Sequence, residues 1–486
     1  MTGDESERGN VRLLGKSEAT PLMAAHQKRT VTIWSLVAIS YFSVAGGPEG
    51  TETIIQNGGA GYAVLGIAVI GLVWSIPTAL MTAELSTMFP ENGGYTLWVS
   101  AAFGPRMGKM AGWLQFISSA VDAALYPALF LSYFKAAAGL GDGAGAWVNW
   151  GIKSVFIGGM FVLNLSGINN VGHGSVGFML LLLAPFVVVI FIAFTGAFTG
   201  ETVLGWEFNT ANWYETPTTG KWSEFLMVLL WNMGYWEGAS VCAGEIENVS
   251  QTFPKALAIV FVIVVANYVL PILAFSGLDN DWAAYDNGYY ITIIRRVGGA
   301  HWAIVLGAAQ CFSAAGLYTS GIVKNGYQLC GMAEQGMLPS ALATRLESTG
   351  APWLALTLCV AITLAFLPIE RFEMILAVDM NLYCAALLLE IAALLRLRTT
   401  DPDRERPYRI GAEDYWLYML FLPAVIVSMF GVFWASWEVL LLSLGLVVAG
   451  VAIIGLLERL RQSHPEWFEE GSGVMHVGDS KNAAGS

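Results

Sequence analysis

Charged residues are scarce in this sequence. Only 13% of its 486 residues are Asp, Glu, Lys or Arg, whereas a soluble protein of this size has about a quarter. So little charge cannot cover the surface of a water-exposed globule, which excludes a cytosolic enzyme. Basic residues are fewer still, with 24 Lys and Arg against 37 acidic residues and a net charge of −13. Without a basic patch, a nucleic-acid partner is excluded as well.

Cysteine is also rare. The five cysteines all lie in apolar segments, which excludes a secreted scaffold held together by disulfides: Cys242, Cys311, Cys330, Cys359 and Cys384. No catalytic constellation is visible along the chain. We therefore expect a protein that is not an enzyme and that holds neither a metal nor a cofactor.

Long apolar runs replace the missing charge. Hydrophobic residues make up 55% of the chain, and the mean hydropathy is +0.58. They gather in a dozen runs of roughly 20 residues, long enough to cross about 30 Å of hydrocarbon. The sequence therefore predicts an all-α polytopic membrane protein with about 12 transmembrane helices. These are expected to begin near Thr32, Tyr62, Gly108, Trp150, Ser175, Lys221, Ala256, Trp302, Pro352, Arg371, Tyr415 and Trp437.

The polar ends and the basic residues predict the organisation and the orientation. We expect a disordered cytoplasmic tail over residues 1–30, a ten-helix core over 31–410, two more helices over 411–460 and a cytoplasmic tail over 461–486. Basic residues favour cytoplasmic loops. With both termini in the cytoplasm, only six of the 24 fall outside: Lys135, Lys153, Lys221, Arg295, Arg296 and Arg371.

Two apolar segments contain a break. The first is interrupted at Ala45-Gly-Gly-Pro-Glu-Gly50, where Pro48 removes a backbone donor and clashes with the preceding turn. In the sixth, Gly234 and Gly238 bracket Tyr235, Trp236 and Glu237. Either break alone is compatible with a kink that has no function. Their spacing, five helices apart, predicts two inverted five-helix repeats around a central substrate site.

The motifs at these breaks resemble the amino acid–polyamine–organocation superfamily, in particular plant polyamine uptake transporters and trypanosomatid polyamine permeases. The resemblance runs from about Val31 to Arg409 and implies twelve helices, a five-plus-five fold and secondary active transport. Heavy-chain-linked exchangers of this superfamily carry a cysteine between helices three and four. This chain has none there, so we expect no disulfide-linked heavy chain. The matching motifs are AGGPEG, WSIPTALMTAELS, FPENGGYTLWVSAAFGP, DAALYPALFLSY, LWNMGYWEGASVCAGEIEN, GMAEQGMLP and RPYRI.

Three carboxylates lie deep in apolar segments. They are Asp122 in the third helix, Glu237 in the sixth-helix break and Glu49 in the first-helix break. A charge at that depth costs at least about 2.5 to 3.5 kcal/mol, so it marks a substrate or ion pathway by default. Polyamines are flexible cations that need spaced acceptors and aromatic faces. Asp122 and Tyr126 are four residues apart and share a helix face.

We therefore predict a substrate site that contains Asp122, Glu237 and aromatic neighbours of both. Each member also has a structural interpretation: the acids as buried hydrogen-bonded groups and the aromatics as packing residues. The predicted substrate-binding set is Gly46, Gly47, Glu49, Asp122, Tyr126, Tyr235, Trp236 and Glu237.

Glu49 departs from the family pattern. In amino-acid transporters of this superfamily the glycine-rich break offers backbone N–H groups to the carboxylate of the substrate, and a glutamate there would repel that carboxylate. The polyamine relatives typically carry an apolar residue at this position. Two interpretations stay open: Glu49 is a further acceptor for a cation, which we favour, or it points away into solvent.

Ion coupling is expected to fall to a carboxylate. No histidine lies centrally, and the fifth helix lacks a central lysine. The candidates for a coupling proton are Asp122, Glu237 and Glu84. Asp379 and Glu390 on the tenth helix are weaker candidates, with Glu390 interpreted as interfacial. Sodium stays an alternative, held in a small oxygen cage of Ser313, Thr319 and Ser320 on the eighth helix together with carbonyls of the first helix.

The sequence therefore predicts a multi-pass transporter, in the plasma membrane rather than an internal one, that takes up putrescine or spermidine by proton-coupled alternating access. Its partners would be the lipid bilayer, protons and a small cationic substrate. Two alternatives stay open. One is an amino-acid transporter on the same fold, for cationic or large neutral substrates. The other is a transporter-like nutrient sensor, which the short tails disfavour.

Overall fold

The structure, a computed structural model, describes residues 29–139, 145–199, 207, 210, 213–214, 219–367, 372–411 and 414–469. Helices dominate these residues, and nine of them are long and apolar enough to cross a membrane. The other three of the twelve expected segments are the shorter α2 (Ile33–Val44), α10 (Thr219–Met233) and α14 (Trp353–Phe366). The predicted all-α polytopic fold is confirmed. Of the predicted tails, only residues 29–30 and 461–469 lie within the described part.

The first repeat contains the first break. It comprises α2, α3 (Thr51–Ile70), a π-helical turn η1 (Gly71–Ser75), α4 (Ile76–Met88), α6 (Pro105–Ala123), α7 (Tyr126–Ala138), α8 (Ala146–Leu165) and α9 (Ile168–Thr199). Thr32 caps α2 by accepting a hydrogen bond from the backbone of Ser35. Gly59 has φ 80°, so the second transmembrane helix begins after this residue, close to the predicted Tyr62.

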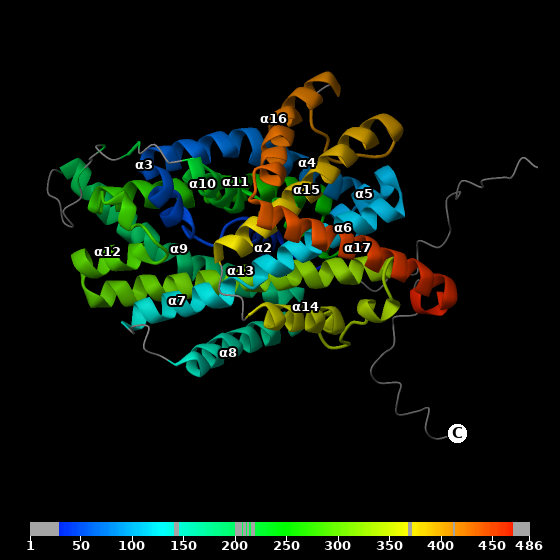
Figure 1. Cartoon of the computed structure of the whole chain (residues 1–486), viewed down its shortest axis with the longest axis horizontal. Coiled ribbons are helices and arrows are strands. Elements are labelled where there is room, and N and C mark those ends of the chain that lie inside the picture. Colours follow the sequence, from blue (N-terminus) through cyan, green and yellow to red (C-terminus); the bar gives the residue numbers. More distant parts are fainter. Residues whose placement is uncertain are drawn as a thin grey trace, which may run out of the picture.

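The second repeat follows the same plan. It comprises α10, the 3₁₀ turn η2 (Gly238–Glu245), α11 (Val249–Leu278), α13 (Ala300–Glu334), α14 and α15 (Phe372–Thr400). Two helices complete the chain, α16 (Asp414–Phe433) and α17 (Trp437–Ser463). Two shorter helices, α5 (Tyr95–Phe103) and α12 (Tyr289–Gly298), lie at opposite ends of the long axis (Figure 1).

The two broken helices meet near the start of the chain. The backbone N–H groups of Thr30 and Val31 donate to the carbonyl of Glu245 at 2.9 and 3.0 Å, and Glu247 N–H donates to Val31 at 3.1 Å. α2 also packs against η2, α11 and α13. The first and sixth transmembrane segments therefore share one interior, and their breaks lie together there.

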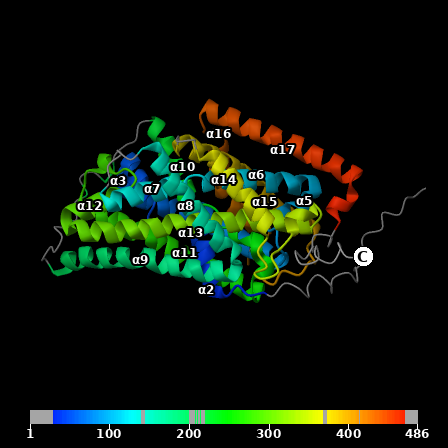
Figure 2. The ribbon, with the colours of Figure 1, turned by 90° about the horizontal axis from the view of Figure 1, so that it is seen from below.

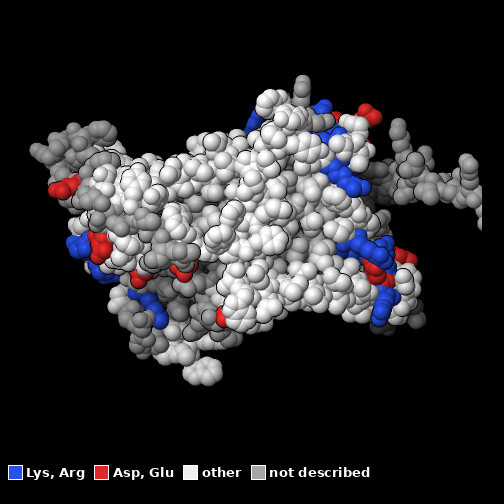
Figure 3. All heavy atoms as spheres, turned by 45° about the horizontal axis from the view of Figure 1, so that its top comes forward, with Lys and Arg blue, Asp and Glu red and all other residues white. Residues whose placement is uncertain are grey.

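The outside of the molecule matches a bilayer. Charged side chains gather at the two ends of the long axis and leave an uncharged belt between them (Figure 3). The peripheral helices α8 and α17 bury only 17% of their apolar stretches, whereas the span formed by α6 and α7 buries 89%. α16 and α17 run along one edge, with α9 along the other (Figure 2). The exposed apolar side chains of these three helices would be in water if the protein were soluble. We therefore assign the outer faces of these helices to contact with lipid.

Candidate substrate site between the two breaks

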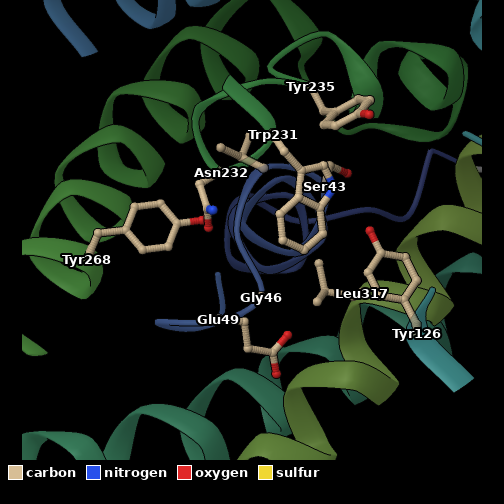
Figure 4. Close-up of a pocket in the computed structure, with 10 residues that line it drawn as sticks. Ser43, Gly46, Glu49, Tyr126, Trp231, Asn232, Tyr235, Tyr268 and Leu317 are labelled. Carbon is tan, nitrogen blue, oxygen red and sulfur yellow. The ribbon is translucent and has the colours of Figure 1, made fainter. Parts of the chain in front are cut away.

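A small cavity lies between the two helix breaks. Its volume is about 10 Å³, which is what a single water molecule requires. The cavity therefore has to widen before it can hold any larger ligand. Figure 4 shows side chains converging on it from both repeats: Ser43, Val44, Gly46, Glu49, Tyr126, Trp231, Asn232, Tyr235, Tyr268 and Leu317.

The first break forms one wall of the cavity. Gly47 and Gly50 have φ values of 111° and 78°, a region open to glycine at no steric cost. Gly46 lets α13 approach closely, because a Cβ there would lie 2.0 Å from Leu317 Cδ1. Glu49 is only 3% exposed, and its carboxylate lies beside the Ser313 hydroxyl of α13 without a hydrogen bond of good geometry to any described residue. The alternative that Glu49 points into solvent is therefore wrong.

Asp122 lies directly behind two aromatic residues of the cavity wall. Its Oδ2 accepts a hydrogen bond from Tyr126 Oη at 2.5 Å, and its Oδ1 accepts one from Trp231 Nε1 at 2.9 Å. The contact with Tyr126 confirms that these residues share a helix face. Trp231, from the end of α10, brings the second repeat to the same carboxylate.

Asp379 on α15 forms a matching arrangement. Its Oδ2 accepts a hydrogen bond from Tyr235 Oη, and its Oδ1 accepts one from Ser118 Oγ, both at 2.5 Å. Tyr235 has φ 60°, which is unusual for a residue with a side chain. The conformation is held by the Tyr235 N–H, which donates to Tyr383 Oη at 2.6 Å. The second break is thereby fixed with the Tyr235 ring on the cavity.

Glu237 and Glu390 form a second acidic pair, away from the cavity wall. Gln115 Nε2 donates to both, to Glu390 Oε1 at 2.8 Å and to Glu237 Oε1 at 3.3 Å. Tyr383 Oη donates to Glu237 Oε2 at 3.1 Å. Both acids are fully buried, so the interpretation of Glu390 as interfacial is wrong. The packing of α15 against α6 carries it into the interior.

One basic side chain lies among these acids. Lys324 on α13 is 5% exposed, and its Nζ lies 4.3 Å from the centroid of the Tyr235 ring. It interacts electrostatically with four buried carboxylates, those of Asp122, Glu237, Asp379 and Glu390. The site therefore combines one lining carboxylate, that of Glu49, with aromatic faces, further buried acids behind them and a buried ammonium group.

Comparison with known proteins places this architecture in a family. The family model for amino acid permeases matches residues 31–455, which is most of the chain. The chain belongs to the amino acid permease family. It is therefore a transport protein and a multi-pass integral membrane protein, not an enzyme.

Curated relatives of this permease cover nearly its whole length. Polyamine transporter PUT1 of Oryza sativa subsp. japonica is 35% identical over 87% of this chain and 78% of its own. Polyamine transporter RMV1 of Arabidopsis thaliana is 32% identical over 92% and 89%. Aromatic amino acid transport protein AroP of Escherichia coli (strain K12) is 22% identical over 83% and 90%.

Two predicted residues of the permease lie away from the cavity. The Trp236 indole donates to the carbonyl of Met233 at 2.8 Å and packs on Phe261, with ring centroids 5.8 Å apart. Glu84 forms a buried ion pair with Arg398, at 2.7 and 2.6 Å. Trp236 therefore acts in packing, and Glu84 has a full set of structural partners.

Two of the three hydroxyls suggested for sodium face the first transmembrane segment. Ser320 Oγ lies 2.9 Å from Ser43 Oγ and donates to the carbonyl of Ile39 at 3.1 Å. Ser313 lies beside Gly47 in the first break. Thr319 instead donates to the sulfur of Met160 on α8, so it faces away from the other two.

Sequence reasoning missed several residues of this site. Trp231, Gln115, Tyr383 and Lys324 carry signals that were available: each is polar or amphipathic and lies in an apolar segment. A buried lysine is the strongest such signal, because a charge at membrane depth is costly. What the sequence could not provide was the partner of each residue on another helix.

Proposed function

We propose that this permease is a secondary active transporter of polyamines, coupled to protons and working by alternating access. The observation that carries the proposal is the aromatic cavity between the two breaks, which is lined by the Glu49 carboxylate and backed by Asp122 and Asp379. Polyamine transporters among the relatives support the same substrate class. An amine chain with an ammonium group at each end offers what such a lining binds: positive charge for carboxylates and aromatic faces, and methylene groups for apolar contact.

In this proposal the substrate extends between Glu49 and the pair Asp122 and Asp379. Glu49 lies at the first break, where the Ser313 hydroxyl is its neighbour and no basic side chain is ion-paired with it among the described residues. The two aspartates stand behind Tyr126, Trp231 and Tyr235 on the other walls. One ammonium group would bind at each end, and the methylene chain would lie along the aromatic rings. This assigns Glu49 the cation-binding role and leaves Glu237 outside direct substrate contact.

We assign the coupling proton to Glu237 and Glu390. Two carboxylates that share a single amide donor in a dry interior repel each other, so one of them holds a proton. One oxygen of Glu390 has no hydrogen-bond partner among the described residues, which leaves room for that proton. The pair lies beside the second break. A change in its charge therefore acts directly on the part of the sixth transmembrane segment that is not α-helical.

A second candidate is amino-acid transport on the same fold. The family model and the relative AroP favour it. Glu49 opposes it, because the break would present a carboxylate beside the N–H groups that bind the anionic end of an amino acid. We also propose that both termini are cytoplasmic, from the distribution of Lys and Arg, and that the permease acts in the plasma membrane.

The test is uptake of labelled putrescine by proteoliposomes that contain the purified permease. Uptake is measured with and without an inward proton gradient, and with excess spermidine, arginine or leucine outside. We expect uptake of many substrates per protein, stimulated by the gradient and blocked by spermidine alone. Accumulation of arginine or leucine without putrescine would establish the amino-acid alternative. Binding that stops at one substrate per protein would indicate a sensor.

A further inference from the structure

Lys324 presents the same chemical group as the end of a polyamine. Its primary ammonium stands on a four-carbon chain, and putrescine also carries its primary ammonium groups on a four-carbon chain. The ammonium lies 4.3 Å above the Tyr235 ring, a ring whose hydroxyl is bonded to Asp379. This aromatic face and this carboxylate are the pair of groups that a substrate ammonium would use.

The alkyl chain of Lys324 passes close to Gly238 at the second break. A Cβ on Gly238, at the start of η2, would lie 3.2 Å from Lys324 Cδ. The same Cβ would lie 3.2 Å from Ser43 Cβ, so the lysine stem passes the second break between Gly238 and the first transmembrane segment. Across the described residues no ion pair within 4 Å and no hydrogen bond fixes the ammonium group, which stays in place by charge and by its contact with the ring.

The charge balance shows what Lys324 does in an empty site. Four buried carboxylates face this one ammonium, and uncompensated charge at this depth is costly. An empty site without Lys324 would have to gain further protons or bind a cation before it could close. With Lys324 over Tyr235, part of that negative charge is neutralised by the permease itself.

Resting on the proposed polyamine transport, we propose that Lys324 is a tethered stand-in for a substrate ammonium. It occupies the position over Tyr235 in the empty site, and an incoming polyamine displaces it. Two consequences follow. The lysine competes with the substrate and so lowers its affinity. It also lets the empty carrier return across the membrane, so that net uptake proceeds without a polyamine on the other side.

The variant K324M tests both consequences, because methionine keeps an unbranched side chain and removes the charge. Binding of labelled putrescine is measured at equilibrium. Uptake is then compared between empty proteoliposomes, which need return of the empty carrier, and vesicles preloaded with putrescine, which need exchange only. We expect about tenfold tighter binding, since a desolvated ammonium–ring contact of this size no longer has to be displaced. We expect exchange to persist while net uptake falls at least about tenfold.

The matched comparison is K324R, which keeps the positive charge but not the primary ammonium group and should change the ratio of net uptake to exchange less than K324M does. An unchanged ratio in K324M would overturn the inference. Loss of both binding and exchange in K324M would also overturn it, since Lys324 would then support the site instead of competing for it. Failure of the wild-type permease to exchange putrescine would instead refute the proposed function.

Discussion

The buried ion pair between Glu84 and Arg398 is predicted to stabilise the fold without taking part in coupling. The Glu84 side chain is 0% exposed and that of Arg398 is 2% exposed. Two charge-assisted hydrogen bonds join them, at 2.7 and 2.6 Å. The variant E84Q leaves the guanidinium buried without its counter-charge, with one amide oxygen at position 84 and the carbonyl of Ile410 at 3.0 Å as the remaining acceptors. Removing one member of such a pair costs about 3–5 kcal/mol.

Arg406 adds to that cost, because its Nε lies 3.4 Å from Glu84 Oε1 and loses the same acid. The free energy of unfolding is measured by SDS titration in mixed micelles, followed by tryptophan fluorescence. The control is D401N. It breaks an Arg404–Asp401 pair at 3.9 Å whose side chains are 39% and 44% exposed, and an exposed pair is worth at most about 1 kcal/mol.

The same preparations separate stability from coupling. We expect E84Q to keep the wild-type stimulation of putrescine uptake by a proton gradient, measured per folded protein. The double variant E84M/R398M should recover most of the lost stability, because an apolar pair replaces a buried ionic one. The reasoning is refuted if E84Q unfolds like the wild type and yet loses its response to the gradient. Glu84 would then belong to the proton path.

Three further predictions concern the site itself. D122N removes the charge behind Tyr126 and should raise the Kd for putrescine at least tenfold. W231F removes one hydrogen bond to Asp122 and should weaken putrescine binding by only about 1 kcal/mol. Equal effects of the two variants in a binding assay would contradict this. E390Q should abolish stimulation by a proton gradient and keep exchange, and an unchanged gradient response would remove Glu390 from coupling. G46A places a Cβ 2.0 Å from Leu317 and should block transport. The added L317A should restore it, and failure of that rescue would mean another contact is responsible.

Most of the fold was predictable from the sequence because its causes are local. A bilayer demands about 20 apolar residues per helix, and the segments that satisfy this stand out against the rest of the chain. The two breaks were predictable for the same reason: glycine and proline act on their own turn of backbone. Gly47 and Gly50 indeed have positive φ values, and η2 is a 3₁₀ turn in place of an α-helix.

The site was predictable only where one helix supplies both partners. The contact between Asp122 and Tyr126 follows from a spacing of four residues. Trp236 shows the limit of such reasoning. It stands next to Glu237 in the sequence, but the turn of the second break directs its ring onto Phe261.

The sequence by itself determined the membrane-spanning class, the two breaks and the depth of the acidic residues, since composition and local backbone preference decide all three. Only the tertiary structure decided which acids act together. Asp379 came to lie behind Tyr235 of the cavity wall, Glu390 paired with Glu237, Glu84 formed an ion pair with Arg398, and Lys324 came to lie over Tyr235. The physical reason is that the rotation of each helix, and hence the partner of each buried charge, is set by packing against helices that are remote in the chain.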